Sequence, residues 1–198
     1  SILFTFNGIS AHAAACPHTG RSALDAVELM DVAANYMREH VTDNVRIHYA
    51  PIDCGMKPNI VPAKAEVWYY VRARSKAEVE GVTEWLLDIA RGAALMTGTK
   101  VSWEFLTRGN STLVNDTITR MIYEEMCQLK KPEYTEEEMA FAAKIAESAG
   151  AGVSTGKLDL TVPEPIGIEY QCGSTDVSDV THVVPTGNFK VVTQPLGI

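Results

Sequence analysis

His12 is the residue whose type and surroundings point most clearly to chemistry. It stands in segment 8–20 (GISAHAAACPHTG), between a strand-like stretch and a helix-like stretch. Catalytic side chains are often carried by loops at the ends of strands and before helices. The small residues around His12 leave the backbone uncrowded, so the imidazole is free to project. We therefore treat His12 as a candidate catalytic residue, with a packed or solvated histidine as the open alternative.

Cys16 and His18, in the same loop, are weaker candidates. A thiol beside a histidine can act as a nucleophile, but that chemistry also needs an orienting carboxylate and an oxyanion site. Neither feature accompanies these residues in the sequence. We expect Cys16 to be a small, reduced side chain without a catalytic role.

Asn59 and Arg72 are candidates for binding a ligand. Asn59 lies between Pro58 and Pro62, in a rigid loop that could hold its amide against a ligand, although an ordinary Asn turn is equally compatible. Arg72 is in a strand-like stretch rich in aromatic residues, where its guanidinium needs a carboxylate partner. That partner is either a protein acid or a substrate anion. Arg74 is expected to be solvated.

The sequence predicts no metal site on this chain. It contains no H-x-D or H-E-x-x-H motif, and its histidines do not have a ligand spacing: His12, His18, His40, His48 and His182. The four cysteines have no C-x-x-C pair, which argues against a structural zinc site or a disulfide framework: Cys16, Cys54, Cys127 and Cys172. We interpret them as reduced thiols of a cytoplasmic protein.

Composition and charge exclude other classes. The 198 residues are 46% hydrophobic and 21% charged, as in ordinary globular proteins. A net charge of −8 disfavours a nucleic-acid partner, which requires clustered positive charge. The sequence has no apolar run of about 18 residues and no secretory signal, so we expect no membrane partner. The opening SILFTFNGIS lacks an initiator Met and is strand-like from the start, which suggests a piece of a longer chain.

The first 108 residues predict an α+β domain. Apolar residues alternate in the predicted strands and recur every three to four positions in the predicted helices. The order is strand, helix, strand, strand, helix and strand, at 2–7, 21–40, 45–49, 67–72, 75–98 and 101–105. Because each helix must bury its apolar stripe on a sheet, the order predicts a ferredoxin-like, four-stranded antiparallel sheet with two helices. One face of that sheet is left bare. A bare face or a long edge strand of this kind often meets a second copy.

The pattern changes after residue 108. Residues 115–131 predict a helix with Met121 and Leu129 among its inward side chains, and a second helix begins at Thr135. Two short strand-like pieces follow, at 167–170 and 182–185. Residues 109–198 have too few strands for a sheet of their own, so we interpret them as an incomplete α/β segment of a catalytic domain.

Three stretches of the sequence resemble a known family. They are residues 8–24, with the pattern G-x-x-A-H-A-A-x-x-P-H-x-G-R-S-A-L, residues 65–73 (AEVWYYVRA) and residues 173–180 (GSTDVSDV). In their types and order they resemble the lid, or dimerisation, domain and adjoining parts of the zinc amidohydrolases of the aminoacylase/carboxypeptidase class, metallopeptidase family twenty. The likeness is strongest to the aminobenzoyl-glutamate hydrolase branch of that family.

The resemblance implies a role for each candidate residue. Residues 1–108 would be the lid that forms a homodimer, and 109–198 a return to the catalytic domain. His12 would reach into the partner's active site and stabilise the oxyanion formed when a metal-bound water attacks the amide. Asn59 and Arg72 would bind the substrate, the arginine through a carboxylate. Asp176 would lie near the cleft as a further substrate-binding residue.

The same resemblance implies that zinc, or another divalent metal, belongs to the full-length enzyme and not to this fragment. The family's metal ligands and general base lie before the lid and beyond Ile198. We therefore expect this chain alone to be inactive. The leading hypothesis is a fragment of a cytoplasmic amidohydrolase that cleaves an N-acyl amino acid, plausibly p-aminobenzoyl-glutamate. The alternatives are a stand-alone, ferredoxin-like dimeric module that binds a small ligand, or a purely structural dimerisation unit.

Overall fold

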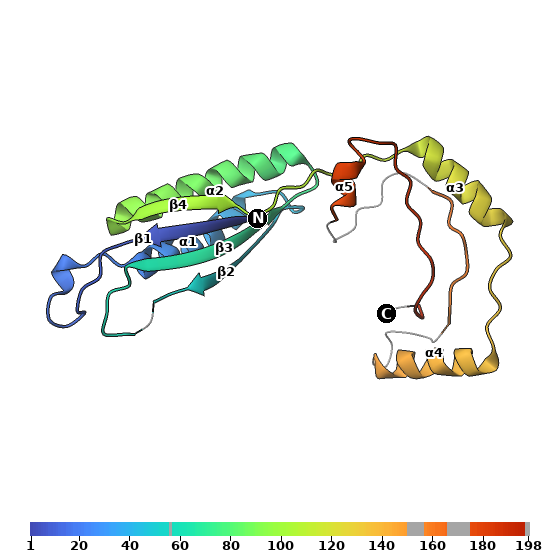
Figure 1. Ribbon diagram of the computed structural model, residues 1–198, viewed down its shortest axis with the longest axis horizontal. Coiled ribbons are helices and arrows are strands. Elements are labelled where there is room, and N and C mark those ends of the chain that lie inside the picture. The colour runs from blue at the N-terminus through green and yellow to red at the C-terminus, as the bar shows by residue number, and fades with distance from the viewer. Residues whose placement is uncertain (56, 150–156, 166–174, 197–198) are drawn as a thin grey trace. The chain divides into compact units, whose positions relative to one another are not determined.

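An antiparallel sheet with two helices on one face is built by the first part of the chain (Figure 1). The computed structural model describes residues 1–55, 57–149, 157–165 and 175–196, which fall into two units, Ser1–Ser111 and Thr112–Ile198. The elements of the first unit are β1 (Ile2–Asn7), α1 (Ala23–Met37), β2 (Arg46–Asp53), β3 (Lys64–Arg72), α2 (Lys76–Thr97) and β4 (Lys100–Phe105). The predicted order of elements is thus confirmed.

The sheet has the strand order β2-β3-β1-β4, and each pair of neighbours is antiparallel. β3 is a central strand, as its bulky residues on both faces predict. The register places Phe4 of β1 opposite Val67 of β3 and Trp103 of β4. β2 and β4 are the edge strands. β2 continues to Asp53, past the predicted end at residue 49, because Ala50, Pro51 and Asp53 still pair with β3.

The helix boundaries follow from capping. Ser22 accepts a hydrogen bond from the backbone of Asp25 at the start of α1, and Ser75 does the same for Glu78 at the start of α2. α2 ends at Gly98, whose φ of 65° suits a residue without a side chain. Ser75 and Glu78 form only half of a capping box, because the Glu78 carboxylate accepts hydrogen bonds from Thr42 and Asn44.

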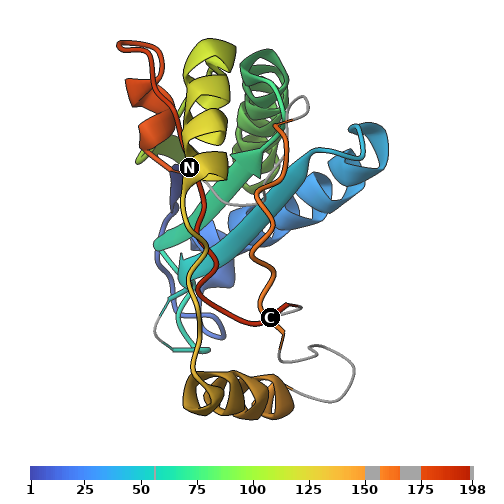
Figure 2. The same ribbon diagram turned by 90° about the vertical axis from the view of Figure 1, so that its right-hand side faces the viewer.

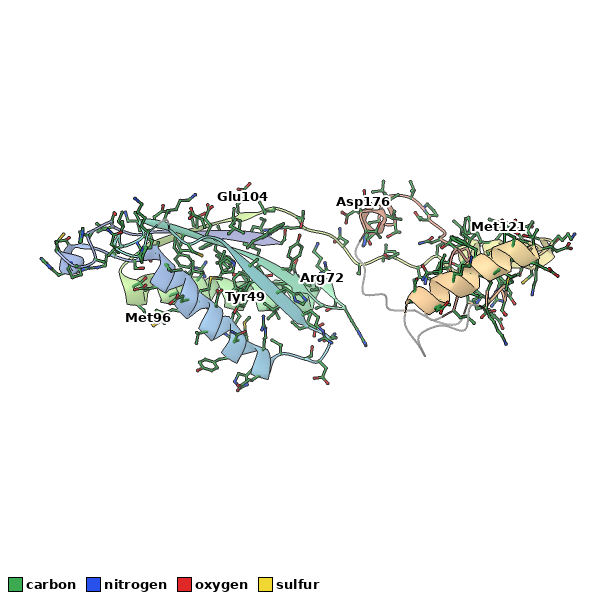
Figure 3. The ribbon with its side chains drawn as sticks, turned by 90° about the horizontal axis from the view of Figure 1, so that it is seen from below. Tyr49, Arg72, Met96, Glu104, Met121 and Asp176 are labelled. Carbon is green, nitrogen blue, oxygen red and sulfur yellow. The ribbon has the colours of Figure 1, made fainter. Side chains whose placement is uncertain are left out.

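The core lies between the helices and one face of the sheet. Alternate residues of the central strands point into it, and Phe4 and Tyr69 meet edge to face with ring centroids 5.7 Å apart. Leu86 of α2 is fully buried among them. Figure 3 shows the two sides of the sheet, with Tyr49 on the helix side and Glu104 on the other. No described element of the first unit covers that second face, so the predicted bare face is present.

A polar network joins α1 to the sheet at the β2 edge. The buried Tyr69 hydroxyl donates to the carboxylate of Asp31, and Arg38 donates to Asn35 Oδ1 and to the carbonyl of Ile47, both at 2.7 Å. Burial raises the pKa of Tyr69, so its hydroxyl stays protonated and remains a donor. Burial also raises the pKa of Asp31 above 3.8, while the Tyr69 hydrogen bond and Arg38 act in the opposite direction.

Tyr69→Phe should lower the free energy of unfolding by about 1–2 kcal/mol, because the half-buried Asp31 carboxylate loses its donor. The raised pKa means that folded Asp31 keeps its proton to a higher pH than unfolded Asp31. The contribution of Asp31 to the free energy of unfolding therefore falls as the pH rises through the interval above 3.8. Because Tyr69→Phe lacks the hydrogen bond to the ionised carboxylate, its loss of unfolding free energy relative to wild type should grow over the same interval.

Urea unfolding at about pH 4 and about pH 7, followed by tryptophan fluorescence, measures this effect. All three tryptophans lie in the first unit, so the signal reports on that unit. A deficit of equal size at both pH values would show that the ionised carboxylate is not the acceptor that matters.

The described residues of the second unit form three helices. They are α3 (Asp116–Gln128), α4 (Glu136–Ser148) and α5 (Val177–Val180), with α3 yellow and α4 orange in Figure 2. α4 begins with a complete capping box between Thr135 and Glu138. α5 is tied to the segment before α3, because Thr181 Oγ1 accepts from the backbone of Leu113 at 2.9 Å.

Two predictions for this unit are wrong. Residues 182–185 are not a strand; they form the turn after α5, held by bonds from Val183 and Val184 to the carbonyl of Val180. Met121 and Leu129 do not point inward, being 56% and 69% exposed. No residue of α3 is buried within the described part of this unit. The other predicted strand, 167–170, lies outside the described residues, and no strand is found in the described part of 112–198.

None of the described helices is long and apolar enough to cross a bilayer.

Candidate functional site

Two loops at one end of the sheet are joined into a single surface. The first, residues 8–22, links β1 to α1, and the second, residues 54–63, links β2 to β3. The amide of Ala13 donates to the carbonyl of Asn59 at 3.0 Å, and that of Val61 donates to the carbonyl of Ala11 at 2.9 Å. His12 and Ile60 thereby form an antiparallel bridge. Asn59 is thus brought beside His12, although 46 residues separate them in the sequence.

Close backbone packing fixes the base of the first loop. Ile9 and Arg21 exchange two hydrogen bonds of 2.8 Å, so the loop closes on itself just before α1. Gly8 sits at this closure, and a Cβ there would lie 1.9 Å from the Arg21 carbonyl oxygen. Only glycine fits such an approach between two backbones. The loop that carries His12 is therefore held firmly where its two ends meet, between β1 and α1.

The His12 side chain is exposed and its ring is oriented by backbone donors. Nδ1 accepts hydrogen bonds from the amides of Ala14 at 3.2 Å and Ala15 at 3.1 Å. A ring nitrogen that accepts carries no proton, so the neutral imidazole has its hydrogen on Nε2. This assignment follows from the hydrogen-bond network. His12 thus presents an N–H donor at the far side of its ring.

Cys16 and His18 belong to the short 3-10 turn of the same loop. Pro17–Thr19 form the turn, and the Cys16 carbonyl accepts both the amide and the hydroxyl of Thr19. These bonds shape the loop behind His12 and do not bring an orienting acid to the thiol.

Arg72 lies at the opposite end of the sheet. The 54–63 loop enters β3 at Lys64, and Arg72 is the last residue of that strand. At about 3.3 Å per residue the two ends of the strand are about 26 Å apart. The guanidinium lies over the ring of Tyr70, 5.7 Å from its centroid. Figure 3 labels Arg72 at this end, far from Met96 near the end of α2. One protomer therefore does not bring Arg72 to His12.

Asp176 is in the second unit, immediately before α5. It is exposed, and Thr175 donates to its carboxylate at 3.4 Å. The buried residues of this region are Ser178 and Thr181, which bond to the chain before α3. Residues 166–174, on its N-terminal side, lie outside the described part, so the structure gives no ligand-binding geometry for Asp176.

The described residues do not fit a metal ion. Nowhere in the part of the chain that the structure describes do three His, Cys, Asp or Glu side chains converge closely enough to hold one.

Sequence reasoning missed a residue on the bare face near Arg72. Arg46 of β2 is directly opposite Arg72 in the strand register. The alternation of β2 contains the signal, since Ile47 and Tyr49 point to the helices and Arg46 and His48 to the other side. The alternation alone could not predict that Arg46 lies opposite Arg72, because that pairing depends on the register between β2 and β3.

The first unit combines an antiparallel sheet, two helices on one face of it and an exposed histidine in a loop at one end. The family model of the M20 peptidase dimerisation domain matches residues 1–95. Residues 1–95 are therefore similar to peptidase dimerisation domains.

Two relatives are similar to the chain over stretches as long as, or longer than, the match to the family model. It is 44% identical over 141 residues to one of the subunits of the p-aminobenzoyl-glutamate hydrolase of Escherichia coli, a match that covers 71% of this chain and 29% of that protein. It is 38% identical over 99 residues to the Xaa-Arg dipeptidase of Mus musculus, covering 50% of this chain and 23% of the relative. The chain thus spans less than a third of the length of either relative.

Solved structures share the fold. An aminobenzoyl-glutamate utilization protein from Klebsiella pneumoniae matches with a TM-score of 0.58 and 21% identity, over 65% of this chain and 33% of that one. A hydantoinase/carbamoylase family amidase from Burkholderia ambifaria matches with a TM-score of 0.54 and 16% identity, over 73% of this chain and 32% of that one. At these identities the likeness establishes the architecture alone.

Proposed function

We propose that this chain is the lid and an adjoining segment of a cytoplasmic, metal-dependent amidohydrolase that cleaves an N-acyl amino acid, with p-aminobenzoyl-glutamate as the leading substrate. The names of the two relatives support amide hydrolysis. Residues 1–108 act as the dimerising lid and 109–198 as part of the catalytic domain. The water that attacks the amide, and the zinc or other divalent metal that activates it, are held by polypeptide outside the described residues.

The orientation of His12 is the observation that carries the proposal. Hydrolysis of an amide passes through a tetrahedral intermediate whose oxygen becomes negatively charged. A preoriented N–H donor stabilises this oxygen more than it stabilises the neutral carbonyl. The two backbone amides on Nδ1 hold His12 as such a donor. Asn59, beside it, contributes a side-chain amide that can contact the substrate next to the scissile bond.

Arg72 binds the carboxylate of the amino-acid half, and it does so from a different protomer. The length of β3, about 26 Å at about 3.3 Å per residue, prevents one copy from supplying both His12 and Arg72 to one small substrate. If two copies pair antiparallel along β2, the two-fold axis is perpendicular to the sheet. Arg72 of one copy and the partner's His12 and Asn59 then lie at the same edge, about three strand spacings or 14 Å apart.

The β2 edge has the properties of a dimer surface. β2 has eight residues against six for β4 and offers an unpaired row of backbone groups. The neighbouring outer face of α1 carries apolar side chains at helical spacing, and β2 adds another: Leu29, Val32, Tyr36 and Ile52. Pairing along β4 would instead place Arg72 about five strand spacings from the partner's His12 and Asn59. The occupant we propose is a second copy of this chain.

Val32→Glu should convert the dimer to a monomer and abolish most turnover together, because a charge would be buried at the interface. Val32 is 48% exposed within one copy, so the fold itself tolerates the change. Sedimentation equilibrium of the complete enzyme measures the association. Leu95→Glu, at the more exposed end of α2, is the control for the added charge and should leave both properties unchanged. A monomeric wild type would contradict the proposal.

Co-expression of two inactive variants tests the shared site directly. His12→Ala and Arg72→Ala homodimers each lack one group in every site. Mixed dimers contain one intact site, so random pairing should restore about a quarter of the wild-type turnover. Absence of recovery in verified mixed dimers would mean that the two residues do not serve one site from two protomers.

The alternative function is a stand-alone, ferredoxin-like dimeric module that binds a small ligand. It predicts ligand binding without hydrolysis by any protein containing this chain. Release of the free amine from an N-acyl amino acid by the complete protein, lost on removal of His12, separates the two.

A further inference from the structure

The outer edge of β2 presents its backbone groups in an order that the sheet fixes. The amide of Gly8 donates to the carbonyl of Ala63 at 2.8 Å, so Ala63 and every second residue of β3 after it direct their backbone groups toward β1. The residues of β2 opposite these direct theirs away from β3, to the outer edge of the sheet. They are Ile47, Tyr49 and Pro51.

The edge is open only over residues 47–51. Just before this stretch, the N–H of Val45 already donates to a carbonyl of the preceding turn, and its own carbonyl accepts Nη1 of Arg46 at 2.8 Å. After it, the register with β3 shifts between Pro51 and Asp53. A second strand can therefore form regular hydrogen bonds only with the short stretch between these points.

Two backbone groups within this stretch are missing or already bonded. Pro51 has no N–H. The carbonyl of Ile47 accepts Nη2 of Arg38 at 2.7 Å. Arg38 is held there by Asn35 Oδ1, which accepts its Nη1 at 2.7 Å, and by the ring of Tyr49, 5.7 Å from its guanidinium. The groups that remain are the N–H of Ile47, both groups of Tyr49 and the carbonyl of Pro51.

These remaining groups are self-complementary when two copies pair antiparallel. In a hydrogen-bonded pair, each residue donates to and accepts from the residue opposite. With Tyr49 opposite the partner's Tyr49, this pair forms two hydrogen bonds. Ile47 then donates to the partner's Pro51, once on each side of the two-fold axis, which adds two more. Pro51, which has no donor, lies opposite the carbonyl that Arg38 has already bonded.

The neighbouring registers lose half of these hydrogen bonds. If the centre moves to His48, the N–H of Tyr49 meets the partner's Ile47 carbonyl, which is already bonded. If the centre moves to Ala50, the carbonyl of Tyr49 meets the partner's Pro51, which has no N–H. Each move of the centre by one residue also slides the partner by two residues, about 7 Å.

We infer that a second copy pairs with β2 in the one register that places Tyr49 opposite the partner's Tyr49, and that Arg38 and Pro51 are positioning residues that exclude the neighbouring registers. The inference rests on the proposed function and extends it, since the proposed site is incomplete without the partner. The register sets how far Arg72 lies from the partner's His12 along the strands. A slip of about 7 Å would change that distance by more than a small substrate can accommodate.

Cross-linking through cysteines on the bare face reports the register. His48 and Ala50 are exposed, and the inferred register places each opposite the other residue of the partner, with Cα atoms about 4.5 Å apart. This spacing suits a disulfide. Differently tagged His48→Cys and Ala50→Cys variants of the complete protein are co-expressed, mildly oxidised and analysed by non-reducing electrophoresis. Mass spectrometry of the linked peptides identifies any cross-link through the native cysteines.

The mixed dimer should give at least about tenfold more of the 48–50 cross-link than either variant alone gives of the 48–48 or 50–50 cross-link. The reason is that each other register loses two hydrogen bonds. A dominant 48–48 or 50–50 cross-link, or no cross-link through either residue, would overturn the inference.

Arg38→Ala and Pro51→Ala should each admit one further register. Removal of the guanidinium frees the Ile47 carbonyl, so the 48–48 cross-link should rise to an amount similar to the 48–50 cross-link. Pro51→Ala supplies the missing N–H, so the 50–50 cross-link should rise likewise. Arg91→Ala, on α2, is the control and should leave the pattern unchanged.

A variant that lowers all cross-links in proportion, without admitting a new one, would show that its residue does not set the register. If Arg38→Ala fails to fold, the pattern of Pro51→Ala decides. Cross-linking needs no substrate, so its outcome is separate from that of the proposed function. The expected cross-links without hydrolysis of any N-acyl amino acid would overturn the proposed function alone, and hydrolysis by a dimer in another register would overturn the inference alone.

Discussion

Replacing His12 by alanine should lower kcat of the complete enzyme by about 10²–10³-fold, with a much smaller change in KM. The imidazole interacts most strongly with the oxygen that becomes negative in the transition state, so its loss affects turnover more than ground-state binding. Steady-state rates of amide hydrolysis provide the measurement. His12→Gln retains an N–H donor and should recover part of the loss.

His18→Ala is the matched control for this experiment. His18 is an exposed histidine in the 3-10 turn of the same loop, and no role in the site is assigned to it. Its removal should leave kcat within about twofold of wild type, in the range of ordinary surface substitutions. Equal losses for the two variants would point to damage of the loop, and a near-normal His12→Ala enzyme would remove His12 from catalysis.

Leu86→Ala should lower the free energy of unfolding of the first unit by about 2–5 kcal/mol. Leu86 is fully buried between α2 and the sheet. Its truncation loses apolar burial and leaves a cavity that the neighbouring core residues cannot fill completely. Urea unfolding followed by tryptophan fluorescence reports on this unit, which contains all three tryptophans.

Leu95→Ala makes the same chemical change on the same helix at a position that is 84% exposed. Because no cavity forms there, the free energy of unfolding should stay within about 0.5 kcal/mol of wild type. A similar cost for both variants would mean that the core is not centred between α2 and the sheet.

Local patterns predicted the first unit well because its elements are regular and bury one face. Alternation in β1 and β3 and the three-to-four spacing in α1 reflect burial on one side. The same reasoning failed for residues 182–185, whose Val-Val pair resembles a strand but is held in a turn by bonds to Val180. It failed again for Met121, because an apolar stripe predicts burial only where a partner surface exists.

The candidate site shows a similar division. The small residues around His12 marked an exposed loop, and the described geometry agrees. The tautomer of the ring could not be foreseen, because it depends on how the backbone at Ala14 and Ala15 turns back to Nδ1. The pairing of Arg46 with Arg72 depends on a strand register that no local pattern specifies.

The sequence by itself determined which segments become helices and strands in the first unit, and which loops carry a histidine and an amide. Periodicity and capping are local, so they can be read from neighbouring residues. Only the tertiary structure decided that Asn59 lies beside His12 and that Arg72 lies at the other end of β3. Those relations arise from non-local strand pairing and loop closure, in which the partners of a residue are chosen by the whole sheet.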